Sequence, residues 1–253
     1  MQSEPAETTD MGKNQWRLGI KRYLIEIMTI FIGITLSFAF EEWRDGKKEN
    51  RATIDLLQGL DLDLVGKTEE VTNDYKANKN CMLYIDSVLD LSTTKQKIPT
   101  RLIKKLYRTV NIDHWFFETT TPSFNIATSQ GAWQQLPDSL RRQIYQVYYA
   151  EFGSSEKYIR KEVEFAGYCT IHYWLPRKII YRRGNIIADN IDNNFIEAPN
   201  NKAVEEALND PEFVASLLLL RNHYFATAKQ LDHTKEMLER LTKNIQLVKF
   251  QLE

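Results

Sequence analysis

The chain has 253 residues, enough for one large domain or two small ones with a sizeable core. Lys and Arg number 33 against 34 Asp and Glu, and the resulting net charge of −1 gives no basic surplus for nucleic acid, so we expect no nucleic-acid partner. Ten Gly and seven Pro are few for this length, which predicts a mostly helical chain. Two cysteines exclude a disulfide-rich scaffold and a four-cysteine zinc site.

The N-terminal region contains an apolar run over residues 23–40 with a single charge, Glu26. As a helix this run would rise about 27 Å, close to the roughly 30 Å hydrocarbon core of a bilayer. Aromatic residues flank the run and bases precede it: Trp16, Tyr23 and Trp43, and Lys13, Arg17, Lys21 and Arg22. This pattern predicts a signal-anchor helix in the lipid bilayer with a cytoplasmic N-terminus. We therefore expect a disordered, basic cytoplasmic lead over 1–20, a transmembrane helix over 21–43 and an extracytoplasmic domain over 44–253.

Two other interpretations of the apolar run stay open. Ser37-Phe38-Ala39 is a passable small-x-small cleavage site, which would make the run a signal peptide. The uncharged part, 27–40, is also short enough for the core helix of a soluble protein. Within a span, Glu26 is costly unless it is paired or reaches the headgroups. We expect Glu26 to face Arg22, four residues away on the same helix face, or a neighbouring helix; simple extension to the headgroups is the alternative.

The rest of the chain predicts an all-α fold, in which the transmembrane helix continues into a helical bundle with long antiparallel stalk helices. Apolar residues three or four apart mark helices over 47–78 and 154–174 and the longest helix from Asp210-Pro211 onward. Residues 80–92 continue the first helix or restart one. Shorter helices are predicted to start at Pro99, Thr121-Pro122 and Pro137-Asp138, the second ending at Gly131. Residues 179–201 read as a hairpin or a loop.

The two longest amphipathic stretches, 47–78 and 212–250, are expected to pack against each other, with Val71 near Leu217. The aromatic middle third would then lie at the far end of this stalk, distal to the bilayer. The alternative is that each apolar stripe pairs with another copy of the chain.

From the sequence we expect no catalytic, cofactor-binding or metal site. Nucleotide-binding glycine motifs, the G-x-S-x-G elbow and H-E-x-x-H are missing from the sequence. Two of the four histidines, His223 and His233, are ten residues apart, too far for an i, i+4 pair. Cys81 and Cys169 either form a disulfide in an oxidising compartment or are two buried thiols. We expect no enzyme.

Aromatic residues gather in the middle third of the sequence. They make a candidate pocket or partner groove, because aromatics dominate interface hot spots. The alternative is that they form a helical core. The candidate residues are Trp115, Phe116, Phe117, Trp133, Tyr148 and Tyr149.

Two stretches together resemble a family of uncharacterised single-span bacterial membrane proteins. One is Tyr23-Leu24-Ile25-Glu26-Ile27, followed by Gly33-Ile34 and Trp43. The other runs over 121–149 and contains Phe124, Ser129, Gly131, Leu140 and Tyr148-Tyr149. The resemblance implies an inner-membrane protein with one span, a cytoplasmic N-terminus and a helical periplasmic domain. The apolar run is also similar to a type IV pilin start at 24–28, but Lys21 and Arg22 stand where a prepilin has its cleavage glycine.

These observations give two hypotheses about function. The first is a non-enzymatic structural or accessory protein whose helical domain binds a protein partner or a second copy. The second is an extracytoplasmic ligand-sensing domain with an aromatic pocket, which would need polar groups converging in an apolar cavity.

Overall fold

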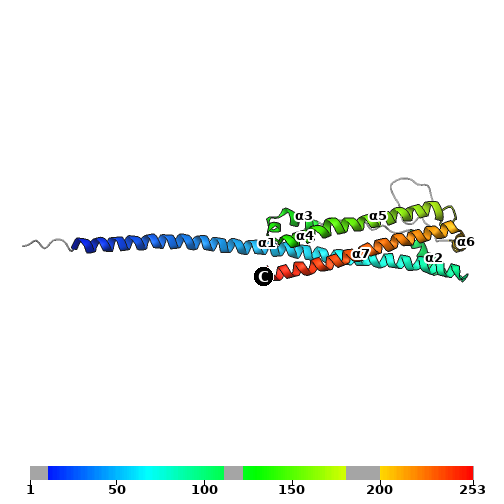
Figure 1. Cartoon of the computed structure of the whole chain (residues 1–253), viewed down its shortest axis with the longest axis horizontal. Helices are drawn as coiled ribbons and strands as arrows, with labels where there is room; N and C mark the ends of the chain where they lie inside the picture. Colours follow the sequence, from blue (N-terminus) through cyan, green and yellow to red (C-terminus); the bar gives the residue numbers. More distant parts are fainter. Residues whose placement is uncertain (1–10, 111–121, 181–199, 253) are drawn as a thin grey trace, which may run out of the picture. The chain divides into compact units, whose positions relative to one another are not determined.

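The structure is a computed structural model that describes residues 11–110, 122–180 and 200–252, with side chains described from residue 23 onward and not for residue 122. These ranges contain helices and turns and no strand, which confirms the all-α prediction. The elements in chain order are α1 Met11–Thr93, α2 Thr100–Arg108, α3 Pro122–Ser129, the 3-10 helix η1 Gly131–Gln135, α4 Asp138–Tyr145, the π-helix η2 Gln146–Glu151, α5 Phe152–Cys169, the π-helix η3 Thr170–Trp174, α6 Asn201–Ala207 and α7 Pro211–Leu252 (Figure 1).

The chain divides into two compact units, residues 1–53 and 54–253. In the first unit, the side chains from Tyr23 to Trp43 are exposed. An 18-residue window here has a mean hydropathy of 1.9, and none of it is buried. By length and composition this part of α1 is able to cross a membrane, a test that a signal sequence also passes. Its exposure does not support the alternative of a buried core helix.

The second unit is built on three long helical segments: residues 54–93 of α1, the continuous run from α4 to η3, and α7 (Figure 1). The side chain of Ser155 on α5 contacts that of Thr234 on α7 at 2.9 Å, and Phe165 stacks on His223. Residue numbers therefore rise along α5 as they fall along α7, so the two helices are antiparallel. Arg221 of α7 likewise donates to Asp86 of α1 at 3.0 Å. The predicted antiparallel packing of α1 and α7 is confirmed.

The predicted register of these two helices is wrong. Val71 belongs to a cluster with Leu231 and Leu238, whereas Leu217 packs in another cluster with Ile85 and Val88. The two helices are thus shifted along each other relative to the expectation. α7 is also not the longest helix, because α1 continues without a break through Gly46 to Thr93 and has 83 residues against 42.

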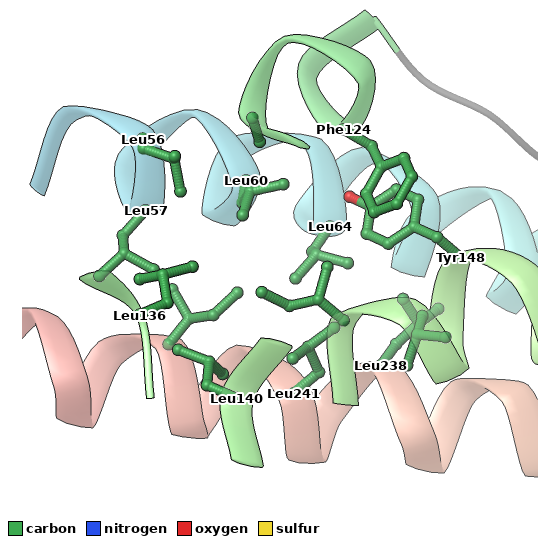
Figure 2. Close-up of a cluster of buried hydrophobic side chains, with 14 of the residues drawn as sticks. Leu56, Leu57, Leu60, Leu64, Phe124, Leu136, Leu140, Tyr148, Leu238 and Leu241 are labelled. Atoms are coloured by element: carbon green, nitrogen blue, oxygen red, sulfur yellow. The ribbon is translucent and has the colours of Figure 1, made fainter. Parts of the chain in front are cut away.

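Two hydrophobic clusters fill the second unit. The first joins the start of this unit to the C-terminal part of α7: Leu56, Leu57, Leu60 and Leu64 face Leu238 and Leu241, and Leu136 and Leu140 complete the packing (Figure 2). The second cluster lies at the other end, where α2 and α6 cover the long helices, and contains Ile103, Leu106, Val204, Phe213 and Trp174. Each buried leucine contributes roughly 1.5–3 kcal/mol, so these clusters hold the long helices together.

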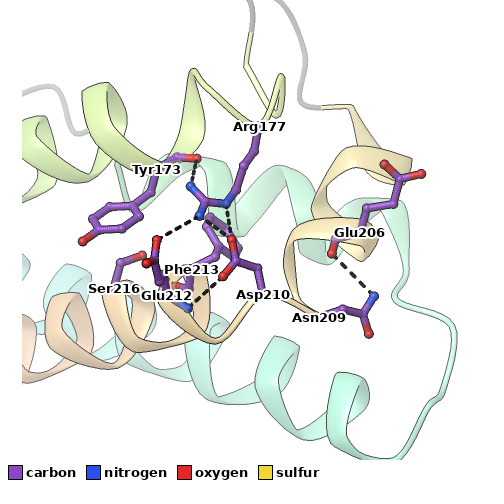
Figure 3. A network of polar contacts seen from close by, with 8 residues as sticks. All are labelled: Tyr173, Arg177, Glu206, Asn209, Asp210, Glu212, Phe213 and Ser216. Atoms are coloured by element: carbon purple, nitrogen blue, oxygen red, sulfur yellow. Dashed lines mark hydrogen bonds and ion pairs between the residues drawn. The ribbon is translucent and has the colours of Figure 1, made fainter.

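Local sequence sets the helix ends. Pro99 and Pro137 precede α2 and α4, and Pro122 and Pro211 are the first residues of α3 and α7, as predicted. Asp210 caps α7 by accepting from the Glu212 amide at 2.9 Å. Arg177 also donates to Asp210, at 2.8 Å from Nε, and to the Tyr173 carbonyl, which ties the end of η3 to the start of α7 (Figure 3). Of the predicted hairpin, residues 181–199 lie outside the described residues.

Candidate functional site

The first candidate site is an aromatic cluster centred on Phe124 of α3. Its ring stacks on Tyr148 with centroids 4.5 Å apart, and the rings of Trp133, Tyr145 and Tyr149 meet it edge to face at 5.5–6.4 Å. Edge-to-face and stacked pairs of this kind stabilise beyond the area that they bury. The cluster is therefore a rigid set of rings supplied by α3, η1, α4 and η2.

The π-helix η2 separates the roles of two neighbouring tyrosines. Tyr148 points into the core (Figure 2) and is only 1% exposed. Its hydroxyl donates to Oδ2 of Asp63 on α1 at 2.5 Å. Tyr149 is 59% exposed and stacks on Tyr145, with centroids 5.7 Å apart. Wider helical turns often occur at functional positions. Here the turn holds one tyrosine inside and the next on the surface.

The predicted aromatic residues thus differ in their positions in the structure. Trp133 and Tyr148 are core residues, and Tyr149 is exposed beside Tyr145, which the sequence reasoning did not single out. Trp115, Phe116 and Phe117 lie outside the described residues. The expected distal position is wrong for this cluster, which packs with Leu60 and Leu64 at the start of the second unit; Trp174, from the same aromatic-rich region of the sequence, does pack at the end that carries Ile85 and Val88.

The predicted membrane residues lie in the first unit. Glu26 is exposed on α1, and the side chain of Arg22 lies outside the described part of the chain. Two hydroxyls in the apolar run are satisfied locally, because Thr29 and Thr35 each donate to the carbonyl four residues earlier at 2.8 Å. This bonding gives both hydroxyls a partner, as a helix that crosses a membrane would require.

A second candidate site, which the sequence reasoning missed, is a layer of polar side chains inside the bundle. On the three long helices it begins within the stretch of the first hydrophobic cluster, where Ser155 and Thr234 lie between cluster residues, and it extends to the start of the second cluster. Its members are Asp74 and Asn78 of α1, Ser155 and Glu162 of α5, and Thr227 and Thr234 of α7. The signal in the sequence is a spacing of seven, which places Ser155 with Glu162, and Thr227 with Thr234, on core-facing positions of two helices.

Two carboxyl groups of this polar layer have raised pKa values. Burial raises the pKa of Glu162 to about 7; a hydrogen bond with Thr227 opposes this rise, and the nearby Asp74 adds to it. Burial also raises the pKa of Asp74 to about 6, where the charge of Glu70 adds to the rise and that of Lys67 opposes it. Perturbed carboxyl groups at a shared position mark candidate functional sites, although structural networks produce them too.

The described residues offer little redox or metal chemistry. Cys81 and Cys169 are free thiols, and burial raises the pKa of each to about 12, so neither is a reactive thiolate. Among the residues with described positions, no group of three His, Cys, Asp or Glu side chains gathers to hold a metal ion. No family model, curated protein or solved structure matches this chain, so the resemblance drawn from its sequence stays a prediction.

Proposed function

We propose that this chain is a single-pass, membrane-anchored accessory protein without enzyme chemistry, whose helical domain associates with a protein partner or with a second copy of itself. The apolar run of α1 would hold the chain in the inner membrane, and the basic residues before it favour a cytoplasmic N-terminus. The domain over 44–253 would then lie in the periplasm. A periplasmic reporter fused after Glu253 should be active, whereas a cytoplasmic reporter at the same position should be silent.

The observation that carries the association is the stacked Tyr145 and Tyr149 pair on the surface. Each ring also rests against the buried part of the cluster, Tyr149 on Phe124 and Tyr145 on Trp133, at 5.4–5.5 Å. A partner that covers such fixed rings loses little side-chain entropy, and tyrosine is enriched in interface hot spots. Trp133 and Tyr148 are buried in the same cluster, which supports a docking surface over the alternative of an aromatic ligand pocket.

A photo-crosslinking amino acid at position 149 tests this proposal in intact membranes. The matched control is position 158, an exposed tyrosine on α5. We expect a discrete cross-linked band for position 149 and none for position 158, with mass spectrometry showing whether the band is a dimer of the chain or a complex with another protein. Equal or no cross-linking at the two positions would contradict the proposal that the Tyr145 and Tyr149 surface is the docking site.

A further inference from the structure

The buried polar layer contains oxygen atoms without the hydrogen-bond partner that burial demands. Glu162 is 4% exposed and Asn78 is 7% exposed. Oε2 of Glu162, Oδ1 of Asn78 and Oδ2 of Asp74 are all fully buried atoms without a hydrogen-bond partner. An unpaired buried acceptor costs roughly 1–3 kcal/mol, and more when it is charged. Such groups in a native protein need an explanation.

These three oxygens share one deficiency, the lack of a donor. The Thr227 hydroxyl hydrogen-bonds with Glu162, and the Asn78 amide group uses one of its two N–H donors on the Asp74 carbonyl at 3.0 Å. A carboxylate can only accept, whereas a protonated carboxyl group carries one O–H donor. A single proton on either acid therefore removes a buried charge and supplies one more donor to a layer in which three buried oxygens have no hydrogen-bond partner.

The charged and titratable neighbours do not neutralise this pair. On α1, Glu70 adds negative charge next to Asp74, and Lys67 offsets part of it while donating to Glu70 at 2.8 Å. Cys81 on α1 and Tyr224 on α7 also interact with Glu162, and both remain neutral near pH 7 because burial raises their pKa values. On α5, Cys169 is likewise a neutral thiol with a raised pKa. A proton is thus the positive charge that the layer can acquire most readily.

We propose that Asp74 and Glu162 form a proton-operated joint in the bundle, in which one bound proton keeps α5 packed against α1 and α7 and its loss loosens this packing. The joint lies between the two hydrophobic clusters, so the helices stay held at both ends while the middle opens. This inference is independent of the docking surface at Tyr149, which lies in the first cluster.

The direction of the pH effect follows from the two pKa values. Both acids have higher pKa values in the folded chain, about 6 and about 7, than the ordinary 3.8 and 4.5 that they have when exposed. The folded state therefore binds more protons than the opened state, and its stabilisation by protonation is complete below about pH 4. This stabilisation is lost as the pH rises through 6 and 7. Low pH therefore favours the closed packing of α5 against α1 and α7, and a pH above 7 favours its opening.

Hydrogen exchange of the full chain in detergent micelles tests the joint at pH 5.5 and pH 8. The rate of each peptide is divided by its unfolded rate at the same pH. For peptides covering 159–166 we expect protection to fall by about tenfold or more between the two pH values, since one pKa unit corresponds to a factor of ten. Peptides covering 238–245, in the first cluster, serve as the internal reference and should change little.

Two substitutions distinguish the effect of protonating Glu162 from the effect of packing its side chain. Glu162→Gln keeps the shape and the acceptor for Thr227 but cannot ionise, so the pH dependence at 159–166 should flatten, with more protection than the natural chain at pH 8. Glu164→Gln changes an exposed carboxyl group on the same helix and should behave as the natural chain does. An unchanged pH dependence in Glu162→Gln would overturn the proposal.

An infrared titration keeps the proposal testable should Glu162→Gln fail to fold. The natural chain should show the C=O band of a protonated carboxyl group at pH 6, a pH at which exposed carboxyl groups are ionised, and the band should fade between pH 6 and pH 8. No such band at pH 6 would show that both acids are ionised inside the bundle, which also overturns the proposal.

Discussion

At the scale of single residues, the Tyr148 hydroxyl joins the aromatic cluster to α1. Tyr148→Phe keeps the ring on Phe124 but removes the donor to Asp63. Hydrogen bonds to charged groups contribute about 1.5–3 kcal/mol, and Asp63 is partly exposed and regains water. We therefore expect the free energy of unfolding to fall by about 1–2 kcal/mol, measured by urea unfolding of the chain in detergent.

The neighbouring residue supplies the control for this loss. Tyr149→Phe removes the same hydroxyl from an exposed ring, so the unfolding free energy should change by less than about 0.5 kcal/mol. If the two variants lost equal stability, the Asp63 contact would not be the source of the effect. The comparison matters for function as well, because it separates the tyrosine that supports the cluster from the tyrosine that we propose for docking.

At the scale of elements, the first hydrophobic cluster fastens α7 to α1. Leu241→Ala leaves a cavity among Leu64, Leu140 and their neighbours, and losses of this kind cost about 2–4 kcal/mol. Leu247 lies on the same helix but is 61% exposed, so Leu247→Ala should cost about 0.5 kcal/mol or less. Thermal unfolding monitored by circular dichroism should show a clearly lower midpoint for the first variant alone. Equal midpoints would mean that α7 does not pack through this face.

The starts of several helices follow from local chemistry, so they could be predicted. A proline in the first turn or just before it is compatible with the helix start wherever the chain folds, and Pro99, Pro137 and Pro211 act in this way. The antiparallel partnership of the long helices followed from their apolar stripes, which cannot remain in water. These features depend on residues close in sequence or on burial alone.

The register and the polar layer depend on contacts between distant residues. An apolar stripe with a three- or four-residue spacing matches another stripe in several registers, so it did not distinguish Val71 beside Leu217 from Val71 beside Leu231. Polar contacts favour one register: Arg221 reaches Asp86 between α7 and α1, and Ser155 meets Thr234 between α5 and α7. Tyr148 and Tyr149 were grouped together as adjacent aromatic residues, but neighbours on a helix point roughly 100° apart, so only Tyr148 is buried and Tyr149 stays exposed.

At the scale of the whole molecule, residues 1–43 of the first unit should be dispensable for folding of the second unit. The buried hydrophobic residues begin at Leu56, and those of the second unit form two clusters among residues 56–245. The apolar side chains of 23–43, in contrast, are exposed, and so large an apolar surface promotes aggregation in plain water. We therefore expect residues 44–253 to be soluble without detergent and to unfold cooperatively within about 3 °C of the full chain in detergent, since about 1 kcal/mol shifts the midpoint of a domain this large by 2–4 °C.

Two measurements on the shortened chain check this expectation. Thermal unfolding followed by circular dichroism compares its midpoint with that of the full chain, and size-exclusion chromatography in plain buffer reports whether it aggregates. The full chain should sediment with membranes after alkaline carbonate treatment, and the shortened chain, expressed without an export signal, should stay in the supernatant. Aggregation of the shortened chain, or a midpoint more than about 5 °C lower, would show that residues 1–43 contribute to the fold of the second unit.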